Sequence, residues 1–216
     1  MTGIRKGRRV YYNGFSHVYD GFIRLHARGE GEDTRDFLVR SAGLPAAGAW
    51  RILDICCGTG AVIRAMARAC TGGLAVGYDF SRGMLRRARE RAGDTGAVFV
   101  EGDAAALPFG KETFDVITCS HALYELKGKA REAALREMRR VVRSTGVVLI
   151  MEHEVPKSPF VRALFRLRMK AMGSEDAREF VQGGLAPYQR VFPGVSLDHT
   201  PSGRSKLVRC RKVKEA

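Results

Sequence analysis

Apolar residues follow two different periods along the middle of the chain. Five short runs rich in Val, Ile and Leu have the length and composition of buried strands, and they cover residues 51–55, 74–78, 97–101, 114–119 and 147–151. Between these runs the apolar residues recur with a helical period, as at Ile63, Met66 and Cys70. Strands that alternate with amphipathic helices predict the α/β class, with a mostly parallel sheet and helices on both of its faces.

The segments on either side of this region predict further helices. Apolar residues at helical spacing indicate helices over residues 14–26 and 34–41, and Gly43 would end the second one. After the fifth strand we expect a basic helix over residues 159–172 and another helix that begins at Ser174. These helices would flank the sheet at the two ends of the sequence.

A C-terminal β-hairpin would close the sheet. Its strands should cover residues 195–200 and 206–213, which brings the expected number of strands to seven. A length of 216 residues fits one elaborated domain better than two. We therefore predict a single doubly wound domain with an N-terminal helical cap (1–50), a core (51–151) and a region of lid helices and closing strands (152–216).

The charge, the apolar runs and the cysteines indicate which partners and which cellular compartment to expect. The 37 Lys and Arg residues outnumber the 23 Asp and Glu residues, and the net charge of +14 keeps nucleic acid, anionic lipid and acidic metabolites open as partners. The longest apolar run, residues 146–151, is far too short to span a membrane, and we expect no secretory leader. The five cysteines include no C-x-x-C pair and match neither a disulfide framework nor a zinc site. We expect a cytoplasmic protein with no bound metal.

The most informative motif is the turn that follows the first strand. Asp54 stands near the end of that strand, and Gly58 and Gly60 allow a tight turn and a close approach of ligand to the backbone. A dinucleotide site would have a third glycine where Ile63 stands, and a carboxylate such as Asp54 would repel a pyrophosphate. The same carboxylate can orient an ammonium group. The motif favours a nucleoside with an amino-acid tail, and an ordinary strand-to-helix turn is the alternative.

These residues resemble the class I S-adenosylmethionine-dependent methyltransferases, in particular the subgroup of ubiquinone and menaquinone biosynthesis. The family pattern D-x-x-x-G-x-G stands here as Asp54, Gly58 and Gly60, and Cys56 takes the place where many members have a first glycine. Segments after the second, third and fourth strands continue the resemblance, which covers about residues 51–151. The resemblance implies a Rossmann-like fold and S-adenosylmethionine as the cofactor.

The resemblance also implies roles for individual residues. Asp79, 19 residues after Gly60, would accept both ribose hydroxyls, and the Asp103 carboxylate and Ala104 amide would meet the adenine ring. Tyr19 would reach the cofactor carboxylate. A role as an aromatic residue of the core is an alternative of equal weight. The complete set of cofactor-binding residues that we predict is Tyr19, Asp54, Cys56, Gly58, Gly60, Asp79, Phe80, Asp103, Ala104 and Ser120.

The side of the site that binds the methyl acceptor has a weaker signature. A sulfonium methyl group is already electrophilic, so the protein has only to align the acceptor, exclude water and remove a proton where the acceptor is acidic. His121 directly follows the fourth strand and is the first candidate for a catalytic residue, and Tyr124 is the second. A surface or packing role is the alternative for each of them.

Three functions remain open at this point. The main hypothesis is methyl transfer to a small-molecule or lipid-like acceptor, such as a quinone precursor, a phospholipid or another metabolite. The net charge suggests an RNA methyltransferase instead, but the chain has neither an N/D-P-P-Y/F motif nor a Pro-Cys nucleophile. A protein that binds the cofactor without catalysis is the third possibility.

The predicted basic helix over residues 159–172 bears on the choice of acceptor. Arg162, Arg166 and Lys170 fall on one face of this helix, while its apolar residues spread across the other. A helix of this kind can bind reversibly to an anionic membrane surface and admit a lipid-like acceptor. An ordinary lid helix with solvated cations is the alternative. The oligomeric state has no signature in the sequence.

Overall fold

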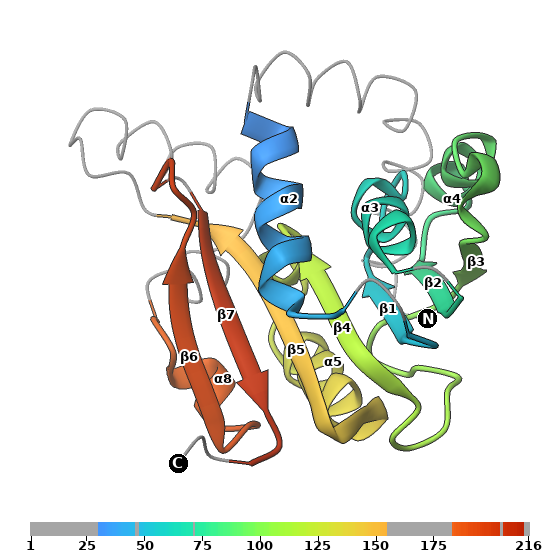
Figure 1. Cartoon of the computed structure of the whole chain (residues 1–216). Helices are drawn as coiled ribbons and strands as arrows, with labels where there is room; N and C mark the ends of the chain where they lie inside the picture. The colour runs from blue at the N-terminus through green and yellow to red at the C-terminus, as the bar shows by residue number, and fades with distance from the viewer. Residues whose placement is uncertain (1–29, 46–47, 71, 155–182, 204, 214–216) are drawn as a thin grey trace. The chain divides into compact units, whose positions relative to one another are not determined.

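The computed structural model describes residues 30–45, 48–70, 72–154, 183–203 and 205–213 (Figure 1). The chain divides into two compact units, Met1–Pro108 and Phe109–Ala216.

The first unit contains three parallel strands with helices between them (Figure 1). Strands β1 (Arg51–Ile55), β2 (Leu74–Asp79) and β3 (Val98–Glu101) pair so that β2 lies in the middle. Helix α3 (Ala61–Ala69) connects β1 to β2; helix α4 (Arg82–Glu90) and the 3₁₀ turn η1 (Gly93–Thr95) connect β2 to β3. Helix α2 (Glu30–Ala42) precedes β1 and contacts α3.

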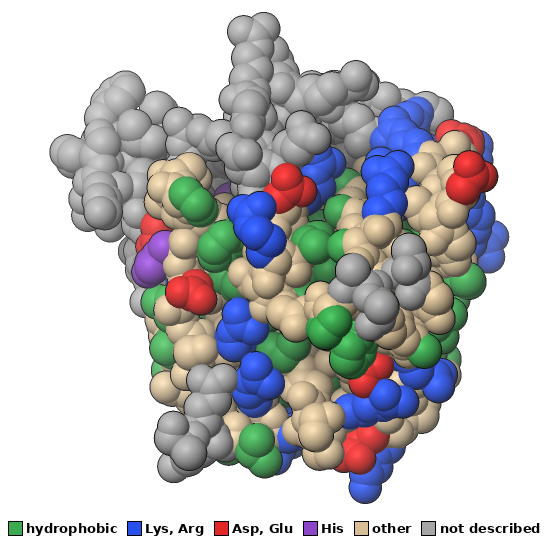
Figure 2. Space-filling model, in the orientation of Figure 1, with side chains coloured by type: hydrophobic (Ala, Val, Ile, Leu, Met, Phe, Trp, Pro, Cys, Tyr) green, Lys and Arg blue, Asp and Glu red, His purple; other side chains and the backbone are tan. Residues whose placement is uncertain are grey.

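Burial of one stripe on each helix explains how this unit holds together. Helix α3 buries Ile63 and Met66, and helix α4 buries Met84, Leu85 and Ala88. Because the three strands are parallel, the turns that follow them meet at one edge of the sheet, as is usual for ligand sites in open α/β sheets. The opposite, exposed side of α4 is rich in arginine. Figure 2 shows Lys and Arg side chains next to acidic ones in the region of α3 and α4.

The second unit contains four strands in mixed orientation. Strand β4 (Phe114–Ser120) leads through the 3₁₀ turn η2 (Leu123–Glu125) and helix α5 (Lys129–Val141) to the long strand β5 (Val142–His153), which pairs with β4 in parallel. A short helix, α8 (Ala186–Gln189), precedes the antiparallel hairpin of β6 (Gly194–His199) and β7 (Ser205–Arg211). Strand β7 also pairs with β5, antiparallel. The strand order is β3-β2-β1 in the first unit and β4-β5-β7-β6 in the second, seven strands in all.

The structure confirms the predicted fold class, including the C-terminal hairpin, and corrects one strand. Strand β5 begins at Val142 rather than at residue 147, directly after α5. Its first residues include polar ones, and its register with β4 shifts between Phe114 and Val116, so this stretch lacks the apolar pattern of a buried strand. An ion pair holds it in place, with 2.6 Å between Arg143 Nη1 and Asp115 Oδ1.

Several predictions fall outside the described residues. These are the helix over 14–26, the basic helix over 159–172 and the helix from Ser174. The helix expected over 34–41 is present and longer, since α2 begins at Glu30. The subdivision at residues 50 and 151 stays a prediction. Within the part of the chain that the structure describes, no helix is long and apolar enough to cross a membrane.

Candidate functional site

The turn between β1 and α3 is tightly constrained by its glycines. Gly58 and Gly60 have positive φ angles of 53° and 77°, a conformation that a side chain disfavours. A Cβ atom on Gly60 would lie 2.9 Å from the ring of Phe99 and 3.1 Å from Cβ of Ala88, so no larger residue fits there. A Cβ atom on Gly58 would meet nothing within 4 Å. The backbone at Gly58 is therefore open to the approach of a ligand.

Two cysteines occupy the same turn and differ in environment. Cys56 is half-buried and adopts a φ angle of 57°, which glycine tolerates better than any residue with a Cβ. The Cys57 amide donates to the carbonyl oxygen of Tyr78 at 3.1 Å and so extends the pairing of β1 with β2. Burial raises the pKa of the Cys57 thiol, and the nearby carboxylates of Asp79 and Asp54 raise it further. The Cys57 side chain is therefore a neutral packing group, not a thiolate nucleophile.

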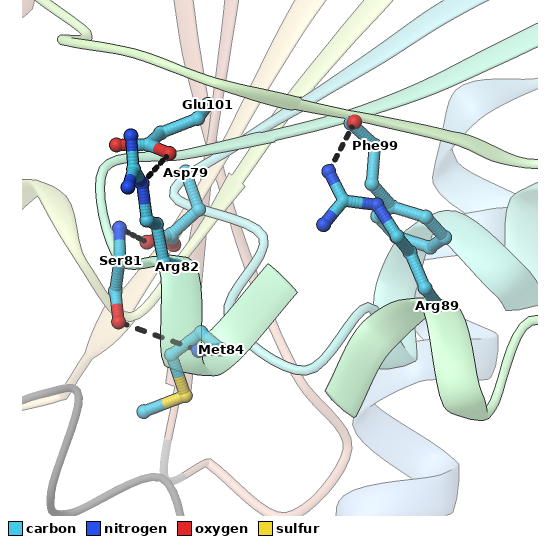
Figure 3. A network of polar contacts seen from close by, with 7 residues as sticks. All are labelled: Asp79, Ser81, Arg82, Met84, Arg89, Phe99 and Glu101. Atoms are coloured by element: carbon cyan, nitrogen blue, oxygen red, sulfur yellow. Dashed lines mark hydrogen bonds and ion pairs between the residues drawn. The ribbon is translucent and has the colours of Figure 1, made fainter. Parts of the chain in front are cut away.

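Asp79 joins two turns of the first unit through its carboxylate. Its Oδ2 accepts a hydrogen bond from the Gly58 amide at 2.9 Å, and its Oδ1 accepts one from the Ser81 amide at 2.8 Å (Figure 3). These two bonds tie the carboxylate to the backbone on both sides of the site. Asp54 is also buried, with 1% of its surface exposed, and acts on the same thiol of Cys57 as Asp79 does. The fold thus brings both predicted acids to the glycine turn.

The start of α4 is fixed by the same network. Ser81 Oγ accepts a hydrogen bond from the Met84 amide at 3.3 Å, which confirms that Ser81 is the N-cap of the helix. Arg82 and Glu101 form an ion pair of 2.6 Å, and Arg89 Nη2 donates to the carbonyl oxygen of Phe99 at 2.9 Å (Figure 3). Phe80, which precedes the cap, is half-buried. These contacts hold the helix that follows Asp79 against β3.

The turn after β3 presents the remaining predicted cofactor residues. Asp103 is half-buried, and its Oδ1 accepts from the Ala105 amide at 3.0 Å. Its carbonyl oxygen accepts from Tyr78 Oη at 3.3 Å, which ties the turn to β2. Within the described chain, the amide of Ala104 has no hydrogen-bond partner. This turn can therefore offer a carboxylate and an adjacent backbone donor, the pair that recognition of an adenine edge requires.

In the second unit, His121 lies at the centre of a group of polar and aromatic side chains that we name the histidine cluster: Ser120, His121, Tyr124, His153 and Ser205. The two ring nitrogens of His121 lie 3.1 Å from Ser120 Oγ and 3.0 Å from Ser205 Oγ. The His121 and His153 ring centroids are 4.4 Å apart, and those of Tyr124 and His153 are 5.6 Å apart. His121 also adopts a positive φ of 51°, and its amide donates to the Met151 carbonyl oxygen at 2.7 Å.

The electrostatics of the cluster limit what His121 can do. Burial lowers the pKa of His121 to about 3, and the neighbouring His153 contributes to this effect. The ring is therefore neutral at physiological pH, with both nitrogens engaged by serine hydroxyls. A neutral imidazole held in this way can orient a ligand by hydrogen bonds and shape, but it is a weak proton acceptor.

Sequence reasoning found some of these residues and missed others. The structure brings together Asp54, Gly58, Asp79, Asp103 and their neighbours in the first unit, and Ser120, His121 and Tyr124 in the second. Ser120, predicted to bind the cofactor, has its hydroxyl on His121 Nδ1. Tyr19 lies outside the described residues. Ser205 was missed because it is 84 residues from His121 in the chain, and no local pattern marks such a contact.

Comparisons with known proteins bear directly on this arrangement. A family model described as "Methyltransferase domain" matches residues 52–146. The demethylmenaquinone methyltransferase of Roseiflexus castenholzii is 40% identical over 190 residues, which cover 83% of this chain and 77% of the relative. The chain belongs to the class I S-adenosylmethionine-dependent methyltransferases.

Other similar proteins agree with this membership. The 2-phytyl-1,4-naphtoquinone methyltransferase of Nostoc punctiforme is 27% identical over 207 residues, covering 94% of this methyltransferase and 86% of the relative. Among solved structures, a TehB-like S-adenosylmethionine-dependent methyltransferase from Corynebacterium glutamicum superposes with a TM-score of 0.61 at 19% identity. That alignment covers 93% of this chain and 99% of the other, and it supports the fold alone.

S-adenosylmethionine is the cofactor of this methyltransferase. The described residues of the first unit fit such a molecule on three counts. The backbone at Gly58 is open, the Asp79 carboxylate is buried beside the same turn, and the Ala104 amide is adjacent to Asp103. When bound, the cofactor supplies an electrophilic methyl group; the chain itself has to hold the molecule and exclude water.

Proposed function

We propose that this methyltransferase methylates the reduced form of a demethylated naphthoquinone. The observation that carries the proposal is the naming of its relatives. The Roseiflexus protein is a demethylmenaquinone methyltransferase, and the Nostoc protein is a 2-phytyl-1,4-naphtoquinone methyltransferase. Both names refer to a substrate with a naphthoquinone ring and a long apolar chain, although the two chains differ. The proposed acceptor class is therefore defined by the ring.

Elementary chemistry selects the reduced form of the acceptor. Methyl transfer from a sulfonium needs an electron-rich nucleophile aligned behind the methyl group. A quinol ring is electron-rich, whereas a quinone ring is electron-poor and a poor nucleophile. We therefore propose the quinol as the substrate and the oxidised quinone as a compound that the enzyme does not methylate.

The cofactor contacts form part of the proposal. We assign Asp54 to the ammonium group of the cofactor, Asp79 to the ribose hydroxyls, and Asp103 with the Ala104 amide to the adenine. This assignment is supported by the burial of Asp54 and Asp79 and by the contact of the Asp79 carboxylate with the Gly58 amide. The remaining residues that we assign to the cofactor are Tyr19, Cys56, Gly58, Gly60, Phe80 and Ser120.

His121 and Tyr124 are proposed as the residues on the acceptor side. The hydrogen bonds of His121 to two serines and the adjacent rings of His153 and Tyr124 support an orienting role. The low pKa of His121 argues that it contributes hydrogen bonding and shape as a neutral ring rather than accepting a proton. His121→Ala should accordingly lower turnover more than it lowers cofactor affinity.

Transfer of a labelled methyl group to defined acceptors tests the proposal. The purified protein is incubated with methyl-labelled S-adenosylmethionine and with demethylmenaquinol, demethylmenaquinone or total RNA. We expect label in the quinol product alone, and reduced transfer by His121→Ala with unchanged cofactor affinity. Label in RNA would favour the RNA methyltransferase, and cofactor binding without any transfer would favour a non-catalytic protein. Either result would overturn the proposed acceptor.

A further inference from the structure

Arg131 on α5 is a buried cation that holds the turn after β4. Its Nε donates to the carbonyl oxygen of Leu123 at 3.3 Å, and its Nη2 donates to that of Tyr124 at 3.2 Å. Both carbonyls belong to η2, which carries the Tyr124 ring into contact with His153 and, through it, with His121. A planar guanidinium that binds two acceptors fixes direction as well as position. The placement of the Tyr124 ring therefore depends on Arg131.

Glu152 is a buried acid on β5, and Arg131 is one of the charged groups that act on it. Only 1% of its surface is exposed, and among the described residues neither of its oxygens makes a hydrogen bond of ordinary geometry, although the backbone amide of Tyr124 is near enough to lower its pKa. The charged and titratable groups around it are Lys206 on β7, Arg131 on α5, Glu125 in η2 and Tyr188 on α8. Burial penalises the charged form, and it raises the pKa of Glu152 to about 8 although Lys206, Arg131 and the backbone amide of Tyr124 oppose the shift.

We propose that Arg131 is a positioning residue for the histidine cluster and that the charge on Glu152 controls it. With Glu152 neutral, the guanidinium of Arg131 stays on the two carbonyls of η2, as in the structure. An ionised Glu152 competes for the same guanidinium, because charge-assisted hydrogen bonds are stronger than bonds to neutral carbonyls. The turn then loses its clamp, and Tyr124 and the two histidines shift together.

The link to catalysis rests on the proposed function, which assigns His121 and Tyr124 to the acceptor. The link among Arg131, Glu152 and the histidine cluster does not rest on the proposed function, because it concerns residues of the second unit alone. Two measurements can therefore be made separately, one without any acceptor and one with it.

The first measurement follows the imidazole Cε1–Hε1 signals of the full-length protein by NMR across pH 6 to 9.5. The chain has five histidines, and the variants His121→Gln and His153→Gln assign the two signals of interest. In the native protein both signals should move together with a midpoint near pH 8, and in Glu152→Gln this movement should be absent. Glu112→Gln is the matched control, since Glu112 is an exposed acid paired with Lys212 in the same unit.

Variants of Arg131 test the clamp directly. Arg131→Gln should shift both histidine signals at every pH, whereas Arg136→Gln should leave them in place, because Arg136 is exposed on the same helix and pairs only with Glu132 among the described residues. Arg131→Lys serves if Arg131→Gln does not fold, since it keeps the charge but loses the planar, fixed arrangement of donors. Unmoved signals in a folded Arg131 variant, or a midpoint near pH 8 that persists in Glu152→Gln, would overturn the inference.

The second measurement uses demethylmenaquinol as the acceptor. Arg131→Lys should lower kcat at least about tenfold, as expected for misplaced orienting groups, while KM for S-adenosylmethionine stays within about twofold. The ratio of turnover at pH 6.5 to that at pH 9 should be high in the native protein and in Glu112→Gln, and close to one in Glu152→Gln. Equal ratios in all three proteins would overturn the inference. An absence of quinol methylation by the native protein would contradict the proposed function alone, because the NMR result does not involve the acceptor.

Discussion

Asp79 stabilises the folded chain in addition to its predicted role as a ligand contact. Its carboxylate accepts the amides of Gly58 and Ser81, so it connects the glycine turn to the start of α4. The sequence predicts an acid at this place from its spacing after Gly60. The bond to the Ser81 amide is local, but the bond to the Gly58 amide could not be predicted, because it depends on the parallel pairing of β1 with β2. A substitution at Asp79 therefore has two separable effects.

Asp79→Asn should weaken binding of S-adenosylmethionine by about 1–3 kcal/mol, because an amide replaces the charged acceptor of the ligand hydroxyls. Isothermal titration calorimetry measures this effect, and thermal unfolding measures the accompanying loss of stability. Asp94→Asn is the control, since Asp94 is an exposed acid of the same unit. NAD should show no appreciable binding to the native protein. An unchanged dissociation constant in folded Asp79→Asn would remove Asp79 from the cofactor site.

Cys56 stores backbone strain that a glycine would release. Its φ of 57° lies in the left-handed region, which costs a residue with a Cβ about 1–2 kcal/mol. Cys56→Gly should raise the free energy of unfolding by about 0.5–1 kcal/mol, after the greater chain entropy of glycine in the unfolded state is subtracted. Urea denaturation measures the change. Cys56→Ser keeps the Cβ and should show no gain in the free energy of unfolding. An equal gain in both variants would mean that loss of the sulfur, not release of backbone strain, stabilises the protein.

His121 should make the stability of the protein depend on pH below neutrality. Its folded-state pKa of about 3 lies below the unfolded value of 6.5, so the unfolded chain takes up a proton first as the pH falls. The contribution of the neutral ring is present above pH 6.5 and is lost progressively towards pH 3. By proton linkage the loss reaches about 2 kcal/mol at pH 5. His121→Gln should be correspondingly less sensitive between pH 7.5 and 5 in denaturant titrations, and an identical pH dependence in both proteins would contradict the neutral ring.

At the scale of single elements, α4 shows how local chemistry sets a boundary. The residue pattern predicts a helix that begins after Ser81, and the structure places Ser81 Oγ on the Met84 amide. Ser81→Ala should lower the free energy of unfolding by about 1 kcal/mol, the usual effect of losing an N-cap. Chemical denaturation tests this value against Ser196→Ala, an exposed serine of β6. A loss no larger than that of the control would mean that the cap contributes nothing measurable.

Elements differ in how far the sequence could define them. Strand β1 has the predicted limits because apolar side chains fill it, and all but its first residue are buried. Strand β5 starts earlier than predicted because its first part includes Ser144 and Thr145, both exposed, and it owes its place to the ion pair between Arg143 and Asp115. The histidine cluster shows the same limit. Its β4 residues follow from the pattern of one strand, while Ser205 and Arg131 reach it from elements that only the tertiary fold brings near.

On the scale of the whole molecule, the excess of positive charge is the property that composition shows most directly. The net charge is +14, and Figure 2 shows Lys and Arg side chains spread over the visible face with acidic side chains among them. Many of the described cations are engaged locally, as in the pairs Arg86–Glu90 and Arg136–Glu132. Such exposed pairs contribute little to stability.

The native protein should bind anionic phospholipid vesicles reversibly at low salt, because each cation near such a surface is worth about 1 kcal/mol. The segment that we propose for this contact is residues 159–172. The triple change Arg162→Glu, Arg166→Glu and Lys170→Glu should abolish sedimentation with vesicles and leave cofactor affinity intact. The control is an equal charge change at Arg86, Arg136 and Arg139, which are exposed on α4 and α5. Equal loss in both variants would indicate an unspecific effect of net charge.

The position of β7 has a consequence for the newly made chain. Strand β7 is later in the sequence than both of its neighbours, yet it lies between β5 and β6. During synthesis, β5 therefore leaves the ribosome with five consecutive apolar residues, 147–151, and one unpaired backbone edge, and it stays so until residues 205–211 follow. An open apolar edge is a template for pairing with other chains. A chain that is terminated before residues 205–211 are made is therefore expected to aggregate, because this edge of β5 stays unpaired.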